Sequence, residues 1–156
     1  MNINKSTRHS KIAGDFGEML VLYWLSKYGF ECARVDHTGI DLIANNPHTK
    51  EIMGISVKSR TRTAGQERTD VSITVKDVEN IEKACKAFRC SPYVAIVVDG
   101  KDVIRVFITS LARLLYYFPK KPFSGWKMTP SHLTRYANDP QVMAFELEIK
   151  QGNWWA

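Results

Sequence analysis

Residues 38–60 read TGIDLIANNPHTKEIMGISVKSR, two short apolar runs separated by NNPHTK. The runs, 40–45 and 52–59, predict neighbouring strands, because Asn and Pro between them are typical of a turn. Each run carries a charge, Asp41 in the first and Lys58 near the end of the second. A charge inside an apolar strand costs free energy unless a partner compensates it. We therefore expect the two side chains to converge on a polar site.

The alternation of side chains in a strand places two of these polar residues together. Residues two positions apart share a face, so Ser56 and Lys58 point the same way. Asp41 points to the face opposite its neighbours Ile40 and Leu42. A hairpin in suitable register would bring Asp41 beside Ser56 and Lys58, which predicts a small polar site in an apolar sheet.

The rest of the chain predicts alternating helices and strands. A helix over 11–29 ends at Gly29, a residue that readily adopts the left-handed conformation of helix ends. Thr74 and Asp77 are spaced as a capping box for a helix over 74–88. The other expected elements are strands over 30–35, 92–99 and 102–109, an exposed loop over 59–70, helices over 110–118 and 129–138, and an edge strand over 142–150.

The first helix carries an acid among apolar residues. Its two apolar stripes, which predict a helix covered on two sides, are Phe16, Leu20 and Tyr23, and Val21, Leu22 and Leu25. Glu18 lies near Lys11 at the N-terminal end of one stripe and should be partly buried. A buried carboxylate needs a cation or hydrogen bonds. Mg²⁺ would satisfy both Glu18 and Asp41, because this ion is usually held by one or two carboxylates with water and phosphate.

The composition sets the broad class of the protein. With 156 residues, 44% of them hydrophobic, the chain suits a single domain over 1–156, with a core over about 11–110 and an extension over about 110–156. The net charge of +6 favours a polyanionic partner. No apolar run approaches the ~18 residues of a membrane span, and the polar N-terminus lacks a signal core, so we expect a cytoplasmic protein. Three cysteines without a CxxC pair indicate neither a disulfide framework nor a zinc site.

The order of these features resembles the PD-(D/E)XK nuclease superfamily, and within it the archaeal Holliday junction resolvases and other small restriction-like endonucleases. The matching motifs, within about residues 11–99, are Gly17-Glu18, Ile40-Asp41, and Ser56-Val57-Lys58 followed by Ser59-Arg60. The resemblance implies an α/β fold with a restriction-endonuclease-like core of order α-β-β-β-α-β, whose mixed central sheet is flanked by helices. Ile40 replaces the usual proline of the family, and Ser56 replaces the usual acid.

The resemblance also implies a reaction and a role for each residue. The expected function is a DNA endonuclease that hydrolyses phosphodiester bonds with Mg²⁺ or Mn²⁺. Glu18 and Asp41 would be the metal ligands, and Lys58 the catalytic lysine that orients the attacking water. Ser56 offers no charge, and some restriction enzymes with Ser-x-Lys use an acid from the next helix instead. The local candidates for such an acid are Asp70, Asp77, Glu79 and Glu82.

Basic and aromatic residues indicate how DNA would be held. The residues expected to bind phosphates are Lys11, Arg60, Arg62 and Arg68. Phe123 and Trp126 either stack on unpaired bases or pack against the domain. Trp154 and Trp155 suit either a dimer contact or a terminal anchor, and we expect a homodimer because one active site cuts one strand. The alternative function is a nuclease-fold module that binds nucleic acid and has lost hydrolysis with the acid at Ser56.

Overall fold

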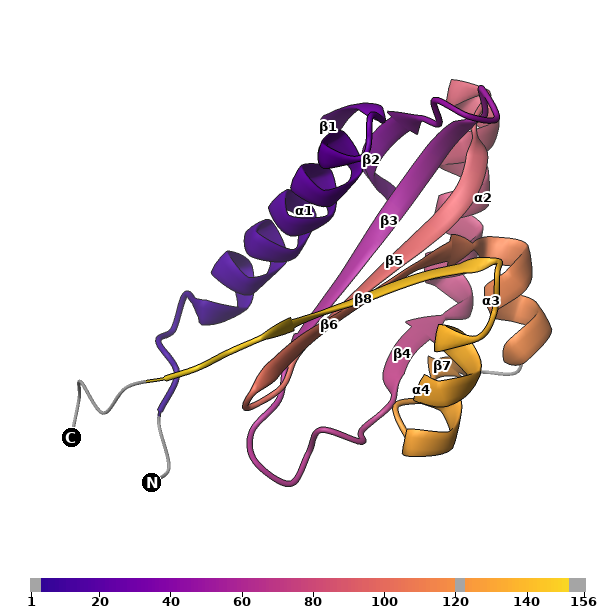
Figure 1. Ribbon diagram of the computed structural model, residues 1–156. Helices are drawn as coiled ribbons and strands as arrows, with labels where there is room; N and C mark the ends of the chain where they lie inside the picture. The colour runs from indigo at the N-terminus through magenta and orange to yellow at the C-terminus, as the bar shows by residue number, and fades with distance from the viewer. Residues whose placement is uncertain (1–3, 120–122, 152–156) are drawn as a thin grey trace.

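The structure is a computed structural model that describes residues 4–119 and 123–151. Figure 1 shows its elements along the chain, which are α1 (His9–Lys27), β1 (Glu31–His37), β2 (Ile40–Asn45), β3 (Ile52–Thr61), β4 (Val71–Thr74), α2 (Val75–Phe88), β5 (Ser91–Asp99), β6 (Val103–Ser110), α3 (Leu111–Tyr117), β7 (Phe123–Trp126), α4 (Pro130–Ala137) and β8 (Val142–Glu148). The predicted order α-β-β-β-α-β is present from α1 to β5, with the short strand β4 inserted before α2.

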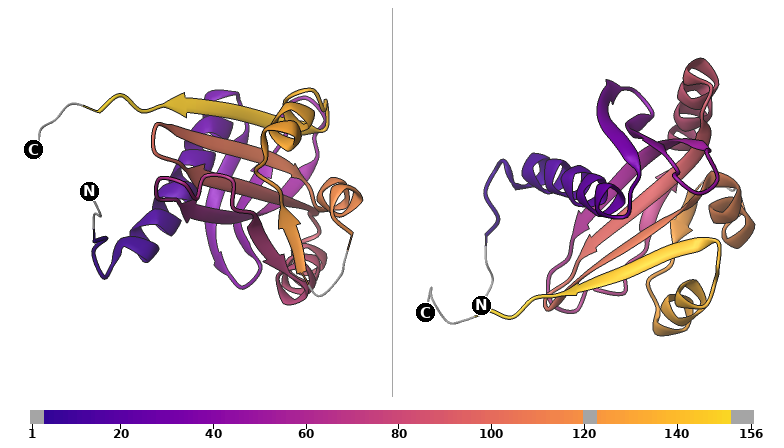
Figure 2. Two further views of the ribbon diagram at one scale, coloured as in Figure 1. Left: turned by 90° about the horizontal axis from the view of Figure 1, so that it is seen from below. Right: turned by 45° about the horizontal axis from the view of Figure 1, so that its top comes forward.

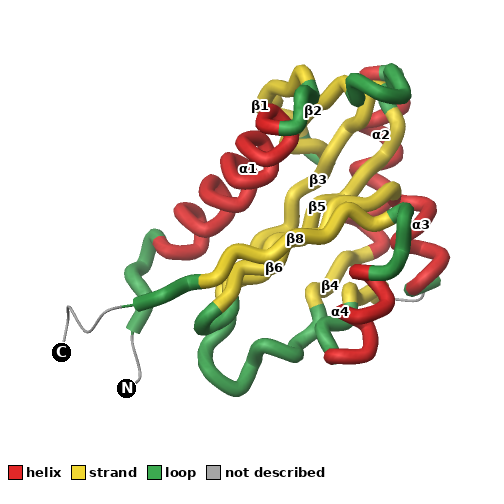
Figure 3. The backbone as a smooth tube through the Cα atoms, in the orientation of Figure 1, coloured by secondary structure: helices red, strands yellow, loops and turns green. Residues whose placement is uncertain are grey.

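Six strands form a mixed central sheet in the order β1-β2-β3-β5-β6-β8. β3 and β5 are parallel, and α2 lies in the connection between them, because parallel neighbours need a crossover. All other neighbours in this sheet are antiparallel. β8 lies at an edge of the sheet, as the alternation over 142–150 predicted. Figure 3 shows these strands as one twisted layer between helices.

Helices cover both faces of the central sheet (Figure 2). α1 packs on one face, where Leu25 and Ile55 belong to one apolar cluster. α2 and α3 pack on the other face, where Ile81 and Leu111 belong to a second cluster. β5 contributes to both clusters, which explains its continuous apolar sequence. Within the described residues, no helix is long and apolar enough to span a membrane.

A second, two-stranded sheet formed by β4 and β7 was not predicted. β7 lies within the segment that contains Phe123 and Trp126 and pairs antiparallel with β4. Trp126 is fully buried, and its ring stacks on that of Tyr136 with 3.9 Å between centroids. Base stacking by Trp126 is therefore wrong, and the packed alternative holds. The predictions for Trp154 and Trp155 lie outside the described residues.

The helix ends follow their local sequence. Gly29 has φ 84° just after α1, in the left-handed region that the sequence predicted. The capping box at the start of α2 is also confirmed, since Thr74 Oγ1 accepts the Asp77 backbone N–H and the Asp77 carboxylate accepts the Thr74 N–H. At α3, Ser110 Oγ accepts the backbone N–H of Arg113. The caps therefore fix where these helices begin.

α1 is covered on one side only. Phe16 is 45% exposed and Tyr23 is 60% exposed, so the prediction of a helix covered on two sides is wrong. Gly17 faces the sheet, where a Cβ would stand 1.8 Å from Oγ of Ser59 on β3. Because glycine has no side chain, α1 can approach β3 closely, and this approach sets the position of Glu18 above the sheet.

Candidate active site

The candidate site lies where α1 crosses the beginning of β2. The register of β1 and β2 shifts between Arg34 and His37, so β1 is irregular beside Asp41. A pocket of about 490 Å³ opens here, and Glu18, Arg34 and Asp41 line it together with Lys11 and His37. The structure therefore brings Glu18 and Asp41 into one pocket from separate elements, whereas Ser56 and Lys58 do not line it.

Asp41 is fixed by the backbone of β3. Its Oδ2 accepts a hydrogen bond of 2.6 Å from the backbone N–H of Val57. Within residues 4–119 and 123–151, no hydrogen bond engages its Oδ1. Burial raises the pKa of Asp41, the Val57 hydrogen bond opposes this rise, and the nearby charge of Glu18 adds to it. Asp41 is therefore a partly compensated carboxylate with one oxygen available for a cation.

Glu18 has a partner on β1. Nη2 of Arg34 lies 2.6 Å from Oε2 of Glu18, and Nε lies 3.1 Å from the same oxygen. Nη2 is also 3.6 Å from Oδ1 of Asp15. The hydrogen bond with Glu18 is the largest of the effects that raise the pKa of Arg34. Sequence reasoning missed this residue, although an arginine in the predicted strand over 30–35, beside the strand of Asp41, was an available signal.

Lys58 extends toward α2. Its Nζ lies 2.9 Å from Oδ1 of Asp77, and its positive charge still lowers the pKa of Asp41. Oδ2 of Asp77 accepts hydrogen bonds from the backbone N–H and the hydroxyl of Thr74. Burial raises the pKa of Asp77, but the hydrogen bonds from Lys58 and Thr74 outweigh it and hold that pKa below its usual value. Ser56 is only 3% exposed and does not line the pocket of Asp41.

Asp77 is the downstream acid that contacts the Ser-x-Lys motif. Asp70, which directly precedes β4, is instead hydrogen-bonded to Lys127, which directly follows β7. Glu79 and Glu82 lie exposed on α2. Both oxygens of Asp77 accept hydrogen bonds, so this residue positions Lys58 and is not an open metal ligand.

The four basic residues expected to bind phosphate differ in their exposure and in their contacts. Arg62 is half-buried and donates to the backbone oxygen of Asp70, which pins the base of the loop. Burial lowers its pKa, and the charge of Arg60 adds to this effect. Arg60 and Arg68 are exposed, as is Lys11, whose Nζ lies 3.1 Å from Asp15. Arg62 thus has a structural role that the sequence did not indicate.

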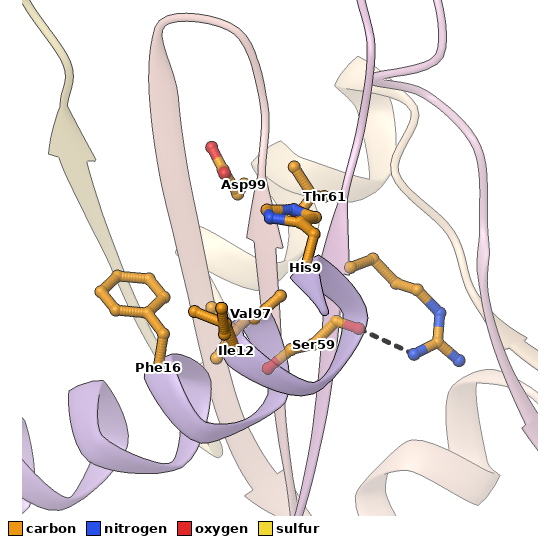
Figure 4. Close-up of a pocket in the computed structure, with 9 residues that line it drawn as sticks. His9, Ile12, Phe16, Ser59, Thr61, Val97 and Asp99 are labelled. Carbon is orange, nitrogen blue, oxygen red and sulfur yellow. Dashed lines mark hydrogen bonds between the residues drawn. The ribbon is translucent and has the colours of Figure 1, made fainter. Parts of the chain in front are cut away.

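A smaller pocket of about 190 Å³ lies between the N-terminal turns of α1 and the ends of β3 and β5 (Figure 4). His9 Nε2 lies 3.1 Å from Thr61 Oγ1, and Asp99 also lines the pocket. Burial raises the pKa of Asp99, whereas the charges of His9 and Lys5 lower it. The hydroxyl of Ser59 is buried without a hydrogen-bond partner among the described residues. The ring of His9 is therefore hydrogen-bonded to Thr61 and not to Ser59.

The residues of the larger pocket fit a divalent cation. The described part of the chain has no cluster of three or more His, Cys, Asp or Glu side chains that could enclose a metal ion. Mg²⁺ does not need such a cluster, because one or two carboxylates suffice when water and phosphate oxygens complete its coordination. Glu18 and Asp41 line one pocket, and each hydrogen-bonds through a single carboxylate oxygen. This donor set fits a water-rich site for Mg²⁺ or Mn²⁺.

No family model and no curated protein sequence matches this chain. Among solved structures, it is similar to Hjc of Archaeoglobus fulgidus, a Holliday junction resolvase from an archaeal hyperthermophile. The match has a TM-score of 0.55 and 19% sequence identity, and it covers 75% of this chain and 91% of Hjc. The predicted fold class is therefore confirmed, with a six-stranded mixed sheet flanked by helices as in that nuclease fold.

Proposed function

We propose that this protein is a DNA endonuclease that hydrolyses phosphodiester bonds with Mg²⁺ or Mn²⁺. The observation that carries the proposal is the meeting of Glu18 from α1 and Asp41 from β2 in one pocket, on a fold shared with a junction resolvase. These two carboxylates would hold the cation. When bound, the cation polarises the phosphate and lowers the pKa of coordinated water.

Other residues would supply the remaining requirements of this reaction. The Val57 N–H holds Oδ2 of Asp41, so the second oxygen of that carboxylate has a defined direction. Asp77 holds the ammonium group of Lys58, which would orient the attacking water and offset charge that develops on the phosphate. Exposed Lys11, Arg60 and Arg68 would contact the DNA backbone and add affinity that depends on salt and not on sequence.

The direct test is single-turnover cleavage of supercoiled plasmid, linear duplex and a four-way junction, with Mg²⁺, with Mn²⁺ and with EDTA. We expect metal-dependent cleavage of at least one substrate and none in EDTA. The Asp41→Asn variant is the control for contaminating nuclease, since it should lose all cleavage while it keeps the fold. Equal cleavage by the wild type and this variant would refute the proposed site.

A homodimer is part of the proposal, because cutting two strands with one site per chain requires two chains. Light scattering of the protein, free and bound to DNA, measures this directly. A monomer in both states would remove the dimer from the proposal and leave the cleavage chemistry untouched.

A second candidate function is a nucleic-acid-binding module that does not cleave. It is favoured by Ser56, which brings no charge to the usual acid position, and by the engagement of Glu18 with Arg34. Salt-sensitive DNA binding by the wild type, without cleavage of any of the three substrates in either metal, would select this function.

A further inference from the structure

The guanidinium group of Arg34 contacts the acid that we assign to the metal. Both Nη2 and Nε approach one oxygen, Oε2 of Glu18, at 2.6 and 3.1 Å. Arg34 is paired with Leu42 across β1 and β2, so it lies beside the strand position of Asp41. Its positive charge also lowers the pKa of Asp41. One arginine thus compensates both carboxylates that we assign to the metal.

A divalent cation and this guanidinium group compete electrostatically. A cation between Glu18 and Asp41 would lie next to Arg34, and like charges at short distance repel each other. Arg34 is nevertheless easy to displace. Its side chain is 45% exposed, and ion pairs exposed to this degree contribute little stability. It also engages a single oxygen of Glu18, whereas a two-pronged pairing would occupy both.

We propose that Arg34 is an exchangeable counter-ion of this pocket, which releases Glu18 when the metal binds and then binds a DNA phosphate. The proposal rests on the proposed function, because it assumes that Glu18 is a metal ligand. A phosphate is the natural second partner, since the arginine fork matches phosphate oxygens and exposed Lys11 lines the same pocket. Phosphate would draw Arg34 from Glu18, and the metal would do the same, so each should favour binding of the other.

The first test measures metal binding without DNA. Mn²⁺ is titrated into wild type, Arg34→Gln, Arg105→Gln and Glu18→Gln, and free Mn²⁺ is followed by electron paramagnetic resonance. Arg105→Gln is the matched control, because it removes one positive charge from another arginine–glutamate pair, with Glu146 at 2.8 Å on β8. We expect Arg34→Gln to bind Mn²⁺ about two- to fivefold more tightly, the range that a partly exposed ion pair represents. Arg105→Gln should match the wild type, and Glu18→Gln should bind more weakly.

The second test measures the coupling between metal and DNA. Affinity for a phosphorothioate duplex, whose hydrolysis is slow, is measured by fluorescence anisotropy with and without Mg²⁺. The gain in affinity that Mg²⁺ produces should be smaller in Arg34→Gln than in the wild type or Arg105→Gln. An equal gain in all three proteins would overturn the exchange.

The outcomes separate this inference from the proposed function. Unchanged or weaker Mn²⁺ binding by Arg34→Gln, with the wild type binding normally and Glu18→Gln impaired, would overturn the exchange and leave the metal site in place. Absence of Mn²⁺ binding in every variant would overturn both. Thermal melting of each variant, monitored by circular dichroism, confirms that affinities are compared between folded proteins.

Discussion

Nζ of Lys58 and Oδ1 of Asp77 lie 2.9 Å apart and join β3 to the first turn of α2. The same carboxylate completes the capping box of α2 with Thr74. Asp77 thus contacts the lysine of the Ser-x-Lys motif, although it lies in the helix that follows that strand. Because both of its oxygens are engaged, Asp77 can orient Lys58 and stabilise the helix start at once.

Asp77→Asn should therefore impair both activity and stability. The amide oxygen can still accept a hydrogen bond from the ammonium of Lys58 but carries no charge to hold it, so single-turnover cleavage should fall by at least tenfold, about the effect of losing a positioned charge in a reaction of this kind. Thr74→Ala is the control, because it weakens the cap at a cost of about 1 kcal/mol and leaves the carboxylate on Lys58. Cleavage that falls equally in both variants, measured well below their melting temperatures, would show that Asp77 acts only on the helix.

The two carboxylates proposed as metal ligands should behave differently from Ser56. Glu18→Gln and Asp41→Asn should each abolish metal-dependent cleavage, because each removes one of the two proposed ligands. Ser56→Ala should retain most activity, since this hydroxyl is buried and lies outside the pocket lining. Cleavage assays of the three variants side by side check this. Full activity in Glu18→Gln would exclude Glu18 as a ligand.

The pH dependence of stability should reveal the state of Asp41. Its pKa is raised in the folded protein, so the folded state binds the proton more tightly than the unfolded chain does. Stability attributable to Asp41 then falls as the pH rises from the ordinary value of 3.8 through the raised pKa, and stays lower above it. Asp41→Asn should consequently melt at a higher temperature than the wild type at pH 7 in EDTA, with a difference that vanishes below about pH 3.8. A melting temperature of Asp41→Asn below that of the wild type at pH 7 would contradict a raised pKa for Asp41.

The basic residues should separate into DNA-binding and structural groups. Arg60→Ala and Arg68→Ala should weaken binding to all duplex sequences. Each should also reduce the slope of the logarithm of affinity against the logarithm of salt concentration by up to about one unit. Arg62→Ala should chiefly lower the melting temperature, because it removes the hydrogen bond to the Asp70 backbone. Salt titrations by anisotropy and thermal melts distinguish the two effects. A salt slope reduced only in Arg62→Ala would reverse this assignment.

Gly17 should be required for the approach of α1 to the sheet. In Gly17→Ala the new Cβ would meet Ser59 Oγ at 1.8 Å, and we expect a loss of about 1–3 kcal/mol in the free energy of unfolding. Ser59→Gly removes the clashing side chain, so the double variant should recover part of that loss. Urea unfolding of the two single variants and the double variant measures the coupling. No recovery in the double variant would show that the clash with Ser59 does not cause the loss of stability in Gly17→Ala.

The sequence by itself determined the order of the elements other than β4 and β7, the glycine end of α1, the capped start of α2, and the residues that carry charge within apolar runs. These features depend on local chemistry. Gly29 takes a positive φ at a helix end, Thr74 and Asp77 cap α2 within one turn, and continuous apolar sequence in β5 reflects burial on both faces. The motif around Asp41 and Lys58 could be found for the same reason, since strand alternation is a local property.

Only the tertiary structure decided which charges meet. Arg34 reaches Glu18 because α1 packs against β1 in the fold, and the sequence does not specify that approach. Of the four candidate acids, Asp77 contacts Lys58, because the crossover connection places the first turn of α2 beside that lysine. β4 and β7 were missed since each has four residues and is stabilised by pairing with a segment distant in sequence. Contacts between distant segments depend on packing, and packing is a property of the assembled fold.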